Sequence, residues 1–276
     1  MKLIVAPTNF STNSMNAAIY AADMALAMKA GLSIIHVYKI PVSAAEIAVQ
    51  PNGIKKIISD AEEKMNELKK IIAARTNREV TISSELIEGS VTQTIEAFCN
   101  SVNTYAIVMG SESGNSFERF LFGGRTIASM KKSNWPIFIV PPGARFEGFR
   151  KVGFACDFKE IINNETVDEI RNIVTTFHAE LHILFVSHKS SLLFDAYINE
   201  QSGWMRKMFE GLDPKYDFIK SEMVDEKIIA YAQRNDLDLL IIVPQNHDLL
   251  FKIFKHSHAR RIVLHANTPI MSIHEP

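Results

Sequence analysis

Short stretches of consecutive apolar residues recur along the chain, separated by longer segments in which apolar residues have helical spacing. Four stretches are apolar at every position: LIVA (3–6), AIVM (106–109), IFIV (137–140) and LLIIV (239–243). Unbroken apolar runs favour strands that are buried on both faces, as in a parallel sheet covered by helices. Their alternation with helices predicts a doubly wound α/β fold.

The first half of the chain follows this alternation throughout. Gly31 is expected to end the first helix, and Ser90 with Gln93 three residues later has the pattern of a capping box at the start of another. The pattern predicts strands at 2–7, 32–38, 80–87, 105–110 and 136–142, and helices at 12–30, 54–75, 91–101 and 119–133.

The second half of the chain repeats the first. LIVAPTNF (3–10) resembles VGFACDF (152–158), LSIIHVYK (32–39) resembles LHILFVSH (181–188), YAIVMG (105–110) resembles LLIIV (239–243), and NWPIFIVPP (134–142) resembles NTPIMSIHE (267–275). We therefore predict two tandem, doubly wound, five-stranded parallel-sheet domains over residues 1–143 and 150–276. The predicted linker, 144–149, lies in a segment rich in proline and glycine.

Composition narrows the classes of partner. With a formal net charge of -1, the chain gives no electrostatic case for binding nucleic acid or an anionic membrane. Its two cysteines have no metal-ligand spacing and fit a reducing compartment. The sequence has neither a signal-peptide pattern nor an apolar run of 18 residues, so we expect a cytoplasmic protein.

The candidate chemistry lies where ligands bind in doubly wound folds, beyond the carboxyl ends of the strands at the point where the strand order reverses. The first and fourth strands end in APTNF (6–10) and MGSES (109–113). The second of these opens a loop that reaches the glycine pair Gly123 and Gly124 before a predicted helix. The backbone of this loop either binds a phosphate group or only connects a strand flexibly to a helix. Asn9 either contacts a ligand or serves as a turn and capping residue.

At this point the chain resembles the universal stress protein family. The resemblance lies in IVAPTNFS (4–11), HVY (36–38), EGS (88–90), VMGSES (108–113) with FLFGG (120–124), and WPIFIVPP (135–142), and it is stronger in the first half. It implies the fold that this family shares with the adenine-nucleotide alpha hydrolases. It also implies that the two domains pair through their last strands, and that the chain can form a homodimer.

ATP-binding members of that family carry G-x2-G-x9-G-[ST] after the fourth strand and often an acidic residue after the first. Here Gly110 and Gly123 match two of the glycines, Ser113 stands at the other with Gly114 beside it, and Gly124 stands at the hydroxyl position. Asn9 takes the acidic position. The nucleotide-binding residues that the resemblance implies are Pro7, Thr8, Asn9, Val37, Met109, Gly110, Ser113, Gly114, Gly123, Gly124, Arg125 and Thr126.

The second half departs further from the motif. Asp157 restores the acidic residue, but the loop after the fourth strand, 243–261, contains no glycine, so we expect a fold partner and no nucleotide site. His256 and His258 lie two residues apart, which predicts a solvated helix face and no metal site.

These observations favour a stress-response sensor that binds an adenine nucleotide weakly in its first half. The nucleotide is ATP, with Mg²⁺, or AMP. No catalytic residue stands out, so we expect no enzyme activity beyond slow, incidental ATP hydrolysis. The alternative is an interaction scaffold that binds no nucleotide and acts through its paired domain surfaces.

Overall fold

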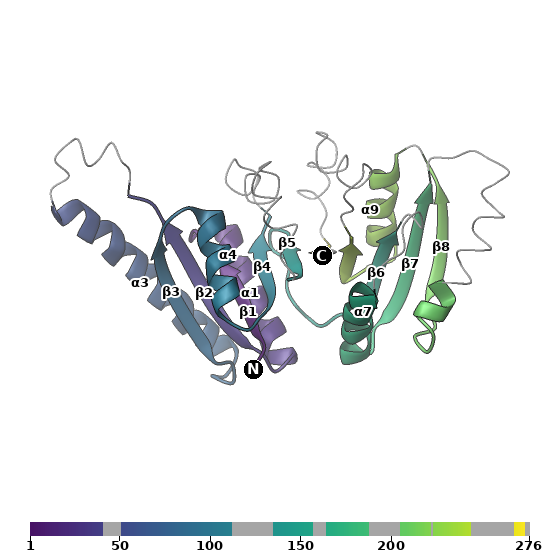
Figure 1. Cartoon of the computed structure of the whole chain (residues 1–276), viewed down its shortest axis with the longest axis horizontal. Helices are drawn as coiled ribbons and strands as arrows, with labels where there is room; N and C mark the ends of the chain where they lie inside the picture. Colours follow the sequence, from purple (N-terminus) through teal and green to yellow (C-terminus); the bar gives the residue numbers. More distant parts are fainter. Residues whose placement is uncertain are drawn as a thin grey trace. The chain divides into compact units, whose positions relative to one another are not determined.

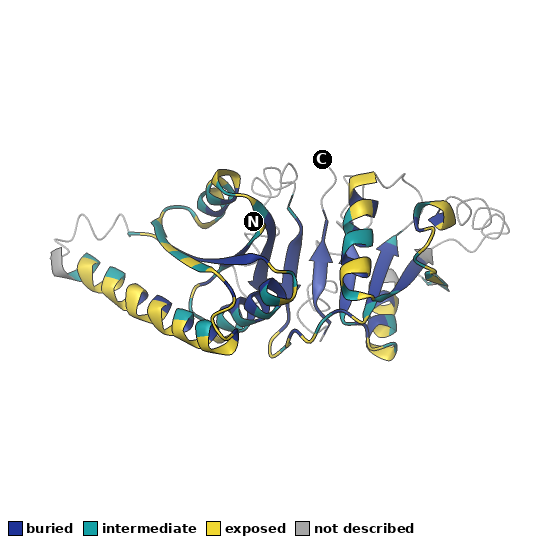
Figure 2. Cartoon of the chain, turned by 90° about the horizontal axis from the view of Figure 1, so that it is seen from below, coloured by how far each residue is buried: buried dark blue, intermediate teal, exposed yellow. Residues whose placement is uncertain are grey.

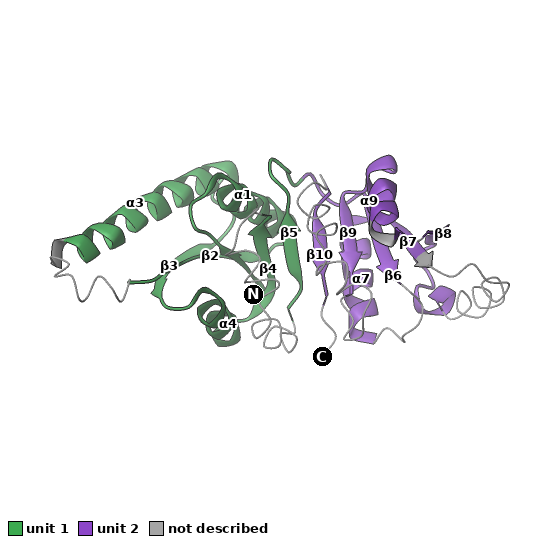
Figure 3. Ribbon diagram, turned by 90° about the horizontal axis from the view of Figure 1, so that it is seen from above, with its two compact units in different colours: residues 1–146 green, residues 147–276 purple. Residues whose placement is uncertain are grey.

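The computed structural model describes residues 1–40, 51–111, 135–156, 164–187, 205–221, 223–243 and 268–273. The chain divides into two compact units, Met1–Phe146 (unit 1) and Glu147–Pro276 (unit 2) (Figure 3). The division falls inside the segment 144–149.

Unit 1 contains a parallel sheet in the strand order β3-β2-β1-β4-β5 (Figure 1). The strand β1 lies in the middle of this order, so the chain first builds outward to β3 and then crosses to β4 and β5 on the other side. The order reverses between β1 and β4, and ligands in doubly wound folds bind beyond the carboxyl ends of the strands at such a point. The strands are β1 (Leu3–Pro7), β2 (Gly31–Tyr38), β3 (Ile82–Glu88), β4 (Thr104–Gly110) and β5 (Ile137–Val140).

Helices cover both faces of this sheet. Figure 3 shows α1 and α3 on one side of unit 1 and α4 on the other. The inner face of α1 is almost entirely small or flexible, with buried alanines and Met24, which lets the helix lie close against β1 and β4. The helices are α1 (Thr12–Ala27), α3 (Pro51–Arg75) and α4 (Val91–Ser101).

Unit 2 contains a second parallel sheet, in the order β8-β7-β6-β9-β10. Strand by strand this is the order of unit 1, with β6 in the place of β1 and β9 in the place of β4. Its described strands are β6 (Lys151–Cys156), β7 (Glu180–Ser187), β8 (Lys215–Lys220), β9 (Leu239–Ile242) and β10 (Ile270–Ser272), and its described helices include α7 (Asn164–Phe177) and α9 (Val224–Arg234).

The unbroken apolar runs form the cores of the two units. Every residue of β5 and of β9 is buried, as are the central residues of β1 and β6. The strand β3 instead alternates between exposed and half-buried positions, as an edge strand does. Figure 2 shows the same contrast between the dark blue central strands and the largely exposed outer side of α3.

Two details of the predicted pattern are wrong. Gly31 does not end the first helix: α1 ends at Ala27, Lys29 takes the left-handed turn with a φ of 52°, and Gly31 already begins β2. Ser90 does precede α4, but its side chain makes no capping hydrogen bond, so the expected capping box is not formed.

Candidate functional site

The candidate site of unit 1 lies at the carboxyl-terminal side of the sheet, where β1, β2 and β4 end. These strands are parallel, and Pro7 of β1 lies opposite Ile35 of β2, so the turn after β1 and the last residues of β2 are neighbours. Six residues of the site implied by the resemblance are described, and they come from these strand ends: Pro7, Thr8, Asn9, Val37, Met109 and Gly110. Ser113, Gly114, Gly123, Gly124, Arg125 and Thr126 lie outside the described residues, as do Asp157, His256 and His258.

The turn between β1 and α1 is organised by the side chain of Ser14. Its hydroxyl oxygen lies 2.9 Å from that of Thr8, 3.2 Å from that of Ser11 and 2.8 Å from Oδ1 of Asn9. Thr8 and Ser14 are both buried. Oδ1 of Asn9 also accepts a hydrogen bond from the backbone N–H of Ser11 at 3.0 Å. Asn9 therefore acts as a turn residue, one of the two roles expected for it.

The same turn fixes the ring of His36 at the end of β2. Nδ1 of His36 lies 2.8 Å from the carbonyl oxygen of Thr8, and because a carbonyl only accepts, Nδ1 carries the hydrogen. The ring of Phe10 lies against the imidazole with 4.5 Å between centroids, and Phe10 adopts a φ of 61°. Among the described residues, Nε2 of His36 has no hydrogen-bond partner, so the imidazole keeps one ring nitrogen for a ligand.

Gly110 is required by packing at the end of β4. A Cβ atom on Gly110 would lie 2.6 Å from the carbonyl oxygen of Asn13 and 3.2 Å from the backbone nitrogen of Ser14. These are backbone atoms in the first turn of α1, so they cannot move aside without displacing the helix. The contact with α1 therefore accounts for the first glycine of the motif, whether or not phosphate approaches it.

Ser111, the next residue, is buried but only partly satisfied. Its backbone N–H donates to the carbonyl of Val140 at 2.9 Å, and its carbonyl accepts from Nδ2 of Asn13 at 3.4 Å. Its side chain is 1% exposed, and Oγ has no hydrogen-bond partner among the described residues. A buried hydroxyl without a partner is costly and uncommon. Sequence reasoning placed no role on Ser111, since nothing in the motif distinguishes it from its neighbours.

Unit 2 holds a different polar cluster, which the sequence analysis missed. His182 is 3% exposed, with Nδ1 2.8 Å from the hydroxyl of Tyr231 and Nε2 2.5 Å from Oε1 of Glu180. Tyr231 donates to Asp217, and Nζ of Lys215 donates to Glu180 at 2.7 Å. The available signal was slight: two polar residues in alternate positions at the start of an otherwise apolar strand.

The pKa values of this cluster follow from its contacts. Lys215 and then His182 lower the pKa of Glu180, because both stabilise the carboxylate. Burial, with the neighbouring carboxylate of Asp217, raises the pKa of Tyr231, which therefore remains a phenol that donates. Glu180 is the first residue of β7 and Lys215 the first of β8, so the cluster begins at the amino ends of these strands.

Two other kinds of feature are absent from the described ranges. There, no three histidine, cysteine, aspartate or glutamate side chains are gathered so that they could hold a metal ion. None of the described helices combines the length and apolarity needed to cross a membrane.

Comparison with known proteins places these features in a family. The model of the universal stress protein family matches residues 1–141, which is half of the chain and includes all the strands of unit 1. A universal stress protein of Methanocaldococcus jannaschii is 29% identical over 141 residues, covering 50% of this chain and 81% of that protein.

Solved structures extend the likeness to the whole chain. A universal stress protein from Archaeoglobus fulgidus DSM 4304 has a TM-score of 0.70 at 18% identity, covering 98% of this chain and 95% of the other. A functionally unknown protein from Pseudomonas aeruginosa PAO1 has a TM-score of 0.60 at 13% identity, covering 99% and 92%. These structures establish the shared fold, and with the match over residues 1–141 they lead to one conclusion: the chain belongs to the universal stress protein family.

Proposed function

We propose that unit 1 binds an adenine nucleotide at the carboxyl ends of β1, β2 and β4, and that the protein acts in the cytoplasm as a stress-response sensor. The nucleotide is AMP, or ATP with Mg²⁺. Binding, and not turnover, is the proposed activity. Family membership and the reversal of strand order between β1 and β4 support this proposal, because ligands in doubly wound folds bind where the strand order reverses.

The observation that carries the proposal is the hydroxyl of Ser111, which has no hydrogen-bond partner in the described part of the chain. It is buried at the end of β4, next to the first turn of α1. The other described side-chain atoms that are buried without a partner, on Ser33 and Tyr216, lie within β2 and near the start of β8, away from this edge. A hydroxyl that can donate and accept beside a helix N-terminus suits a phosphate or ribose oxygen.

The rest of the edge supplies groups suited to a base or a ribose. Nε2 of His36 is available for a hydrogen bond, and Val37 beside it offers apolar contact for a planar ring. Asn9 is less suited to this role, since its Oδ1 already accepts two hydrogen bonds within the turn. We therefore propose that Ser111 and His36 contact the nucleotide. Asn9, which stands where ATP-binding members often carry an acidic residue, is not assigned a contact.

The test is a matched pair of serine substitutions. Ser111→Ala and Ser33→Ala each remove one buried hydroxyl that has no described partner, so neither is expected to destabilise the protein much. Binding of AMP and of ATP with Mg²⁺ is measured by calorimetry, and by the rise in melting temperature, to which a ligand at 100 times its Kd contributes about 2.7 kcal/mol. Ser111→Ala should weaken binding by about 10-fold and Ser33→Ala should leave it unchanged.

Two results would overturn the proposal. If neither nucleotide binds the wild-type protein, the scaffold that acts through domain surfaces becomes the better account. If both nucleotides bind equally well to Ser111→Ala and to the wild type, the site lies elsewhere on the chain.

A further inference from the structure

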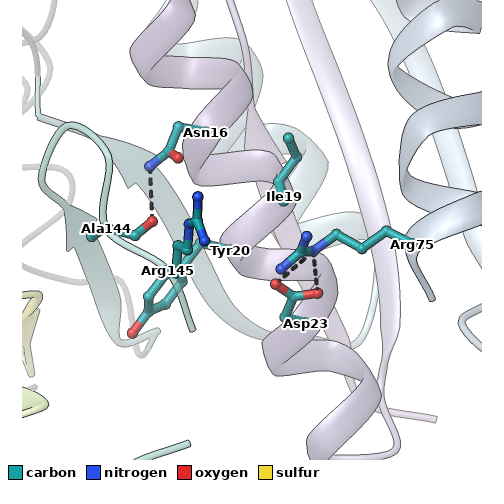
Figure 4. A pocket seen from close by; sticks show the side chains of 7 residues that line it. All are labelled: Asn16, Ile19, Tyr20, Asp23, Arg75, Ala144 and Arg145. Atoms are coloured by element: carbon teal, nitrogen blue, oxygen red, sulfur yellow. Dashed lines mark hydrogen bonds and ion pairs between the residues drawn. The ribbon is translucent and has the colours of Figure 1, made fainter. Parts of the chain in front are cut away.

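A pocket lies in unit 1 that shares no residue with the proposed nucleotide site. It has a volume of about 260 Å³ and lies between α1, the last residue of α3 and the segment that follows β5 (Figure 4). One water molecule occupies about 30 Å³ of liquid, so this pocket suits a ligand of about eight heavy atoms. Its walls are Asn16, Ile19, Tyr20, Asp23, Arg75, Ala144 and Arg145.

The wall after β5 is held in place by the rest of unit 1. The backbone N–H of Ala144 donates to the carbonyl of Pro141 at 3.1 Å, which closes a tight turn, and Nδ2 of Asn16 donates to the carbonyl of Ala144 at 3.1 Å. Phe146 is buried against Tyr20 in an edge-to-face contact with 5.3 Å between ring centroids. The backbone of Arg145 is thus anchored on both sides, and the pocket is formed before any ligand arrives.

The pocket carries one positive charge that no described residue neutralises. Nε of Arg75 lies 2.7 Å and 2.9 Å from the two carboxylate oxygens of Asp23, so these two charges cancel. Arg145 has no hydrogen bond or ion pair with any described residue, although Figure 4 shows its guanidinium among the pocket residues. A bound monoanion would bring the pocket to neutrality, and a guanidinium binds a carboxylate through two parallel hydrogen bonds.

The remaining walls define the body of the ligand. Oδ1 of Asn16 is left as an acceptor, because its Nδ2 is already used to hold Ala144. Ile19 and the ring of Tyr20 supply apolar surface. The pocket therefore combines a carboxylate receptor, one acceptor for an O–H group and a short apolar wall.

We propose that this pocket binds a small hydroxycarboxylate. Arg145 holds the carboxylate, Asn16 accepts the hydroxyl hydrogen, and Ile19 contacts the hydrocarbon part. The site is independent of the nucleotide crevice, since the two share no residue. The protein thus has a site for a second ligand, a small organic acid. The last residues of unit 1 form part of this site.

Three probes distinguish this ligand class by calorimetry and by NMR shifts in unit 1: 3-hydroxybutyrate, butyrate and inorganic phosphate. The hydroxy acid should bind about 5-fold to 10-fold more tightly than butyrate, because only the hydroxy acid satisfies Asn16. Phosphate should bind more weakly than both, because it offers no hydrocarbon body to Ile19.

The variant Arg145→Ala should weaken binding of 3-hydroxybutyrate by at least about 10-fold. Arg78→Ala is the charge-matched control: Arg78 is exposed on unit 1, does not line the pocket, and should change nothing. Ser111→Ala should also leave this binding intact, which separates this site from the nucleotide site. The proposal is overturned if none of the probes binds, if phosphate binds as well as the hydroxy acid, or if Arg145→Ala retains full affinity.

Discussion

The two units share one strand order, yet within the described residues their hydrogen-bonded polar clusters lie at opposite ends of the sheets. In unit 1 the cluster follows the carboxyl end of β1, around Ser14. In unit 2 it begins at the amino ends of β7 and β8, around His182. Doubly wound folds bind ligands at the carboxyl ends of their strands, so the unit 1 cluster lies at the ligand-binding end of its sheet and the unit 2 cluster at the opposite end.

The two clusters also differ in how completely they are satisfied. In unit 2, both ring nitrogens of His182 have partners, and the hydroxyl of Tyr231 contacts both His182 and Asp217. In unit 1, a ring nitrogen of His36 and the hydroxyl of Ser111 are unpartnered among the described residues. A closed network rigidifies a core, whereas an open one at a crevice has hydrogen-bonding capacity left for a ligand.

The largest expected effect comes from replacing a closely packed strand glycine by alanine in each unit. Gly110 at the end of β4 should tolerate the added Cβ atom less well than Gly153 in β6. Gly110→Ala would put Cβ 2.6 Å from a backbone oxygen of α1. Gly153→Ala in β6 would instead meet side-chain methyl groups, that of Leu237 at 2.4 Å and that of Leu240 at 3.4 Å. A side chain can turn aside and a helix backbone cannot. We expect losses in unfolding free energy of about 3 kcal/mol and about 1 kcal/mol respectively, measured by urea denaturation.

Tryptophan fluorescence can assign each loss to its unit. Trp135 belongs to unit 1 and Trp204 to unit 2, so replacing one tryptophan by phenylalanine leaves a reporter for the other unit. Equal losses for the two glycine variants would contradict the proposed difference. So would a Gly110→Ala loss reported only by Trp204.

The fold was predictable because its main signal is local. Buried strands require unbroken apolar runs, and the runs at 106–109 and 239–243 fall within or almost within β4 and β9. Helix ends were less predictable, because several residues can supply the required conformation. Lys29 adopts positive φ although Gly31 follows two residues later.

The candidate site was predictable in position but not in detail. Because β1 and β4 are parallel neighbours, topology alone places Thr8 and Gly110 together at the carboxyl ends of these strands. The partner that makes Gly110 necessary, Asn13, is 97 residues away in the chain, and no local pattern contains that contact. The unpartnered state of Ser111 likewise depends on what three-dimensional packing leaves unpaired, and a motif search reads only residue types and spacing.

The next effect compares the two networks directly. Tyr231→Phe removes the hydroxyl that contacts both His182 and Asp217, leaving a buried ring nitrogen and a carboxylate without that partner. We expect unit 2 to lose about 2 kcal/mol of unfolding free energy. Ser14→Ala in unit 1 should cost only about 1 kcal/mol, because Oδ1 of Asn9 keeps the N–H of Ser11 as a donor.

Denaturation followed through Trp204 for the first variant and Trp135 for the second measures these losses. The comparison between a closed and an open network fails if Ser14→Ala costs more than Tyr231→Phe. A gain in stability for Tyr231→Phe would show that the charged cluster of unit 2 is kept for something other than stability.

The smallest expected effect is the pH-dependent contribution of Glu180, which should be seen in unit 2 and not in unit 1. The pKa of Glu180 is lowered by Lys215 and His182, so the ionised carboxylate stabilises the folded state above the ordinary glutamate pKa of about 4.3, and this contribution is lost as the pH falls through the folded value. Glu180→Gln should therefore lower the stability of unit 2 at neutral pH, while the stabilities of the variant and the wild type converge in acid.

Because the Glu180 side chain is 38% exposed, the stability difference should be smaller than that for Tyr231→Phe and should shrink in salt. Glu180→Gln should not change the unit 1 signal from Trp135, since Glu180 belongs to unit 2. A Glu180→Gln difference that persists unchanged below the folded pKa would mean that Glu180 acts through packing and not through its charge.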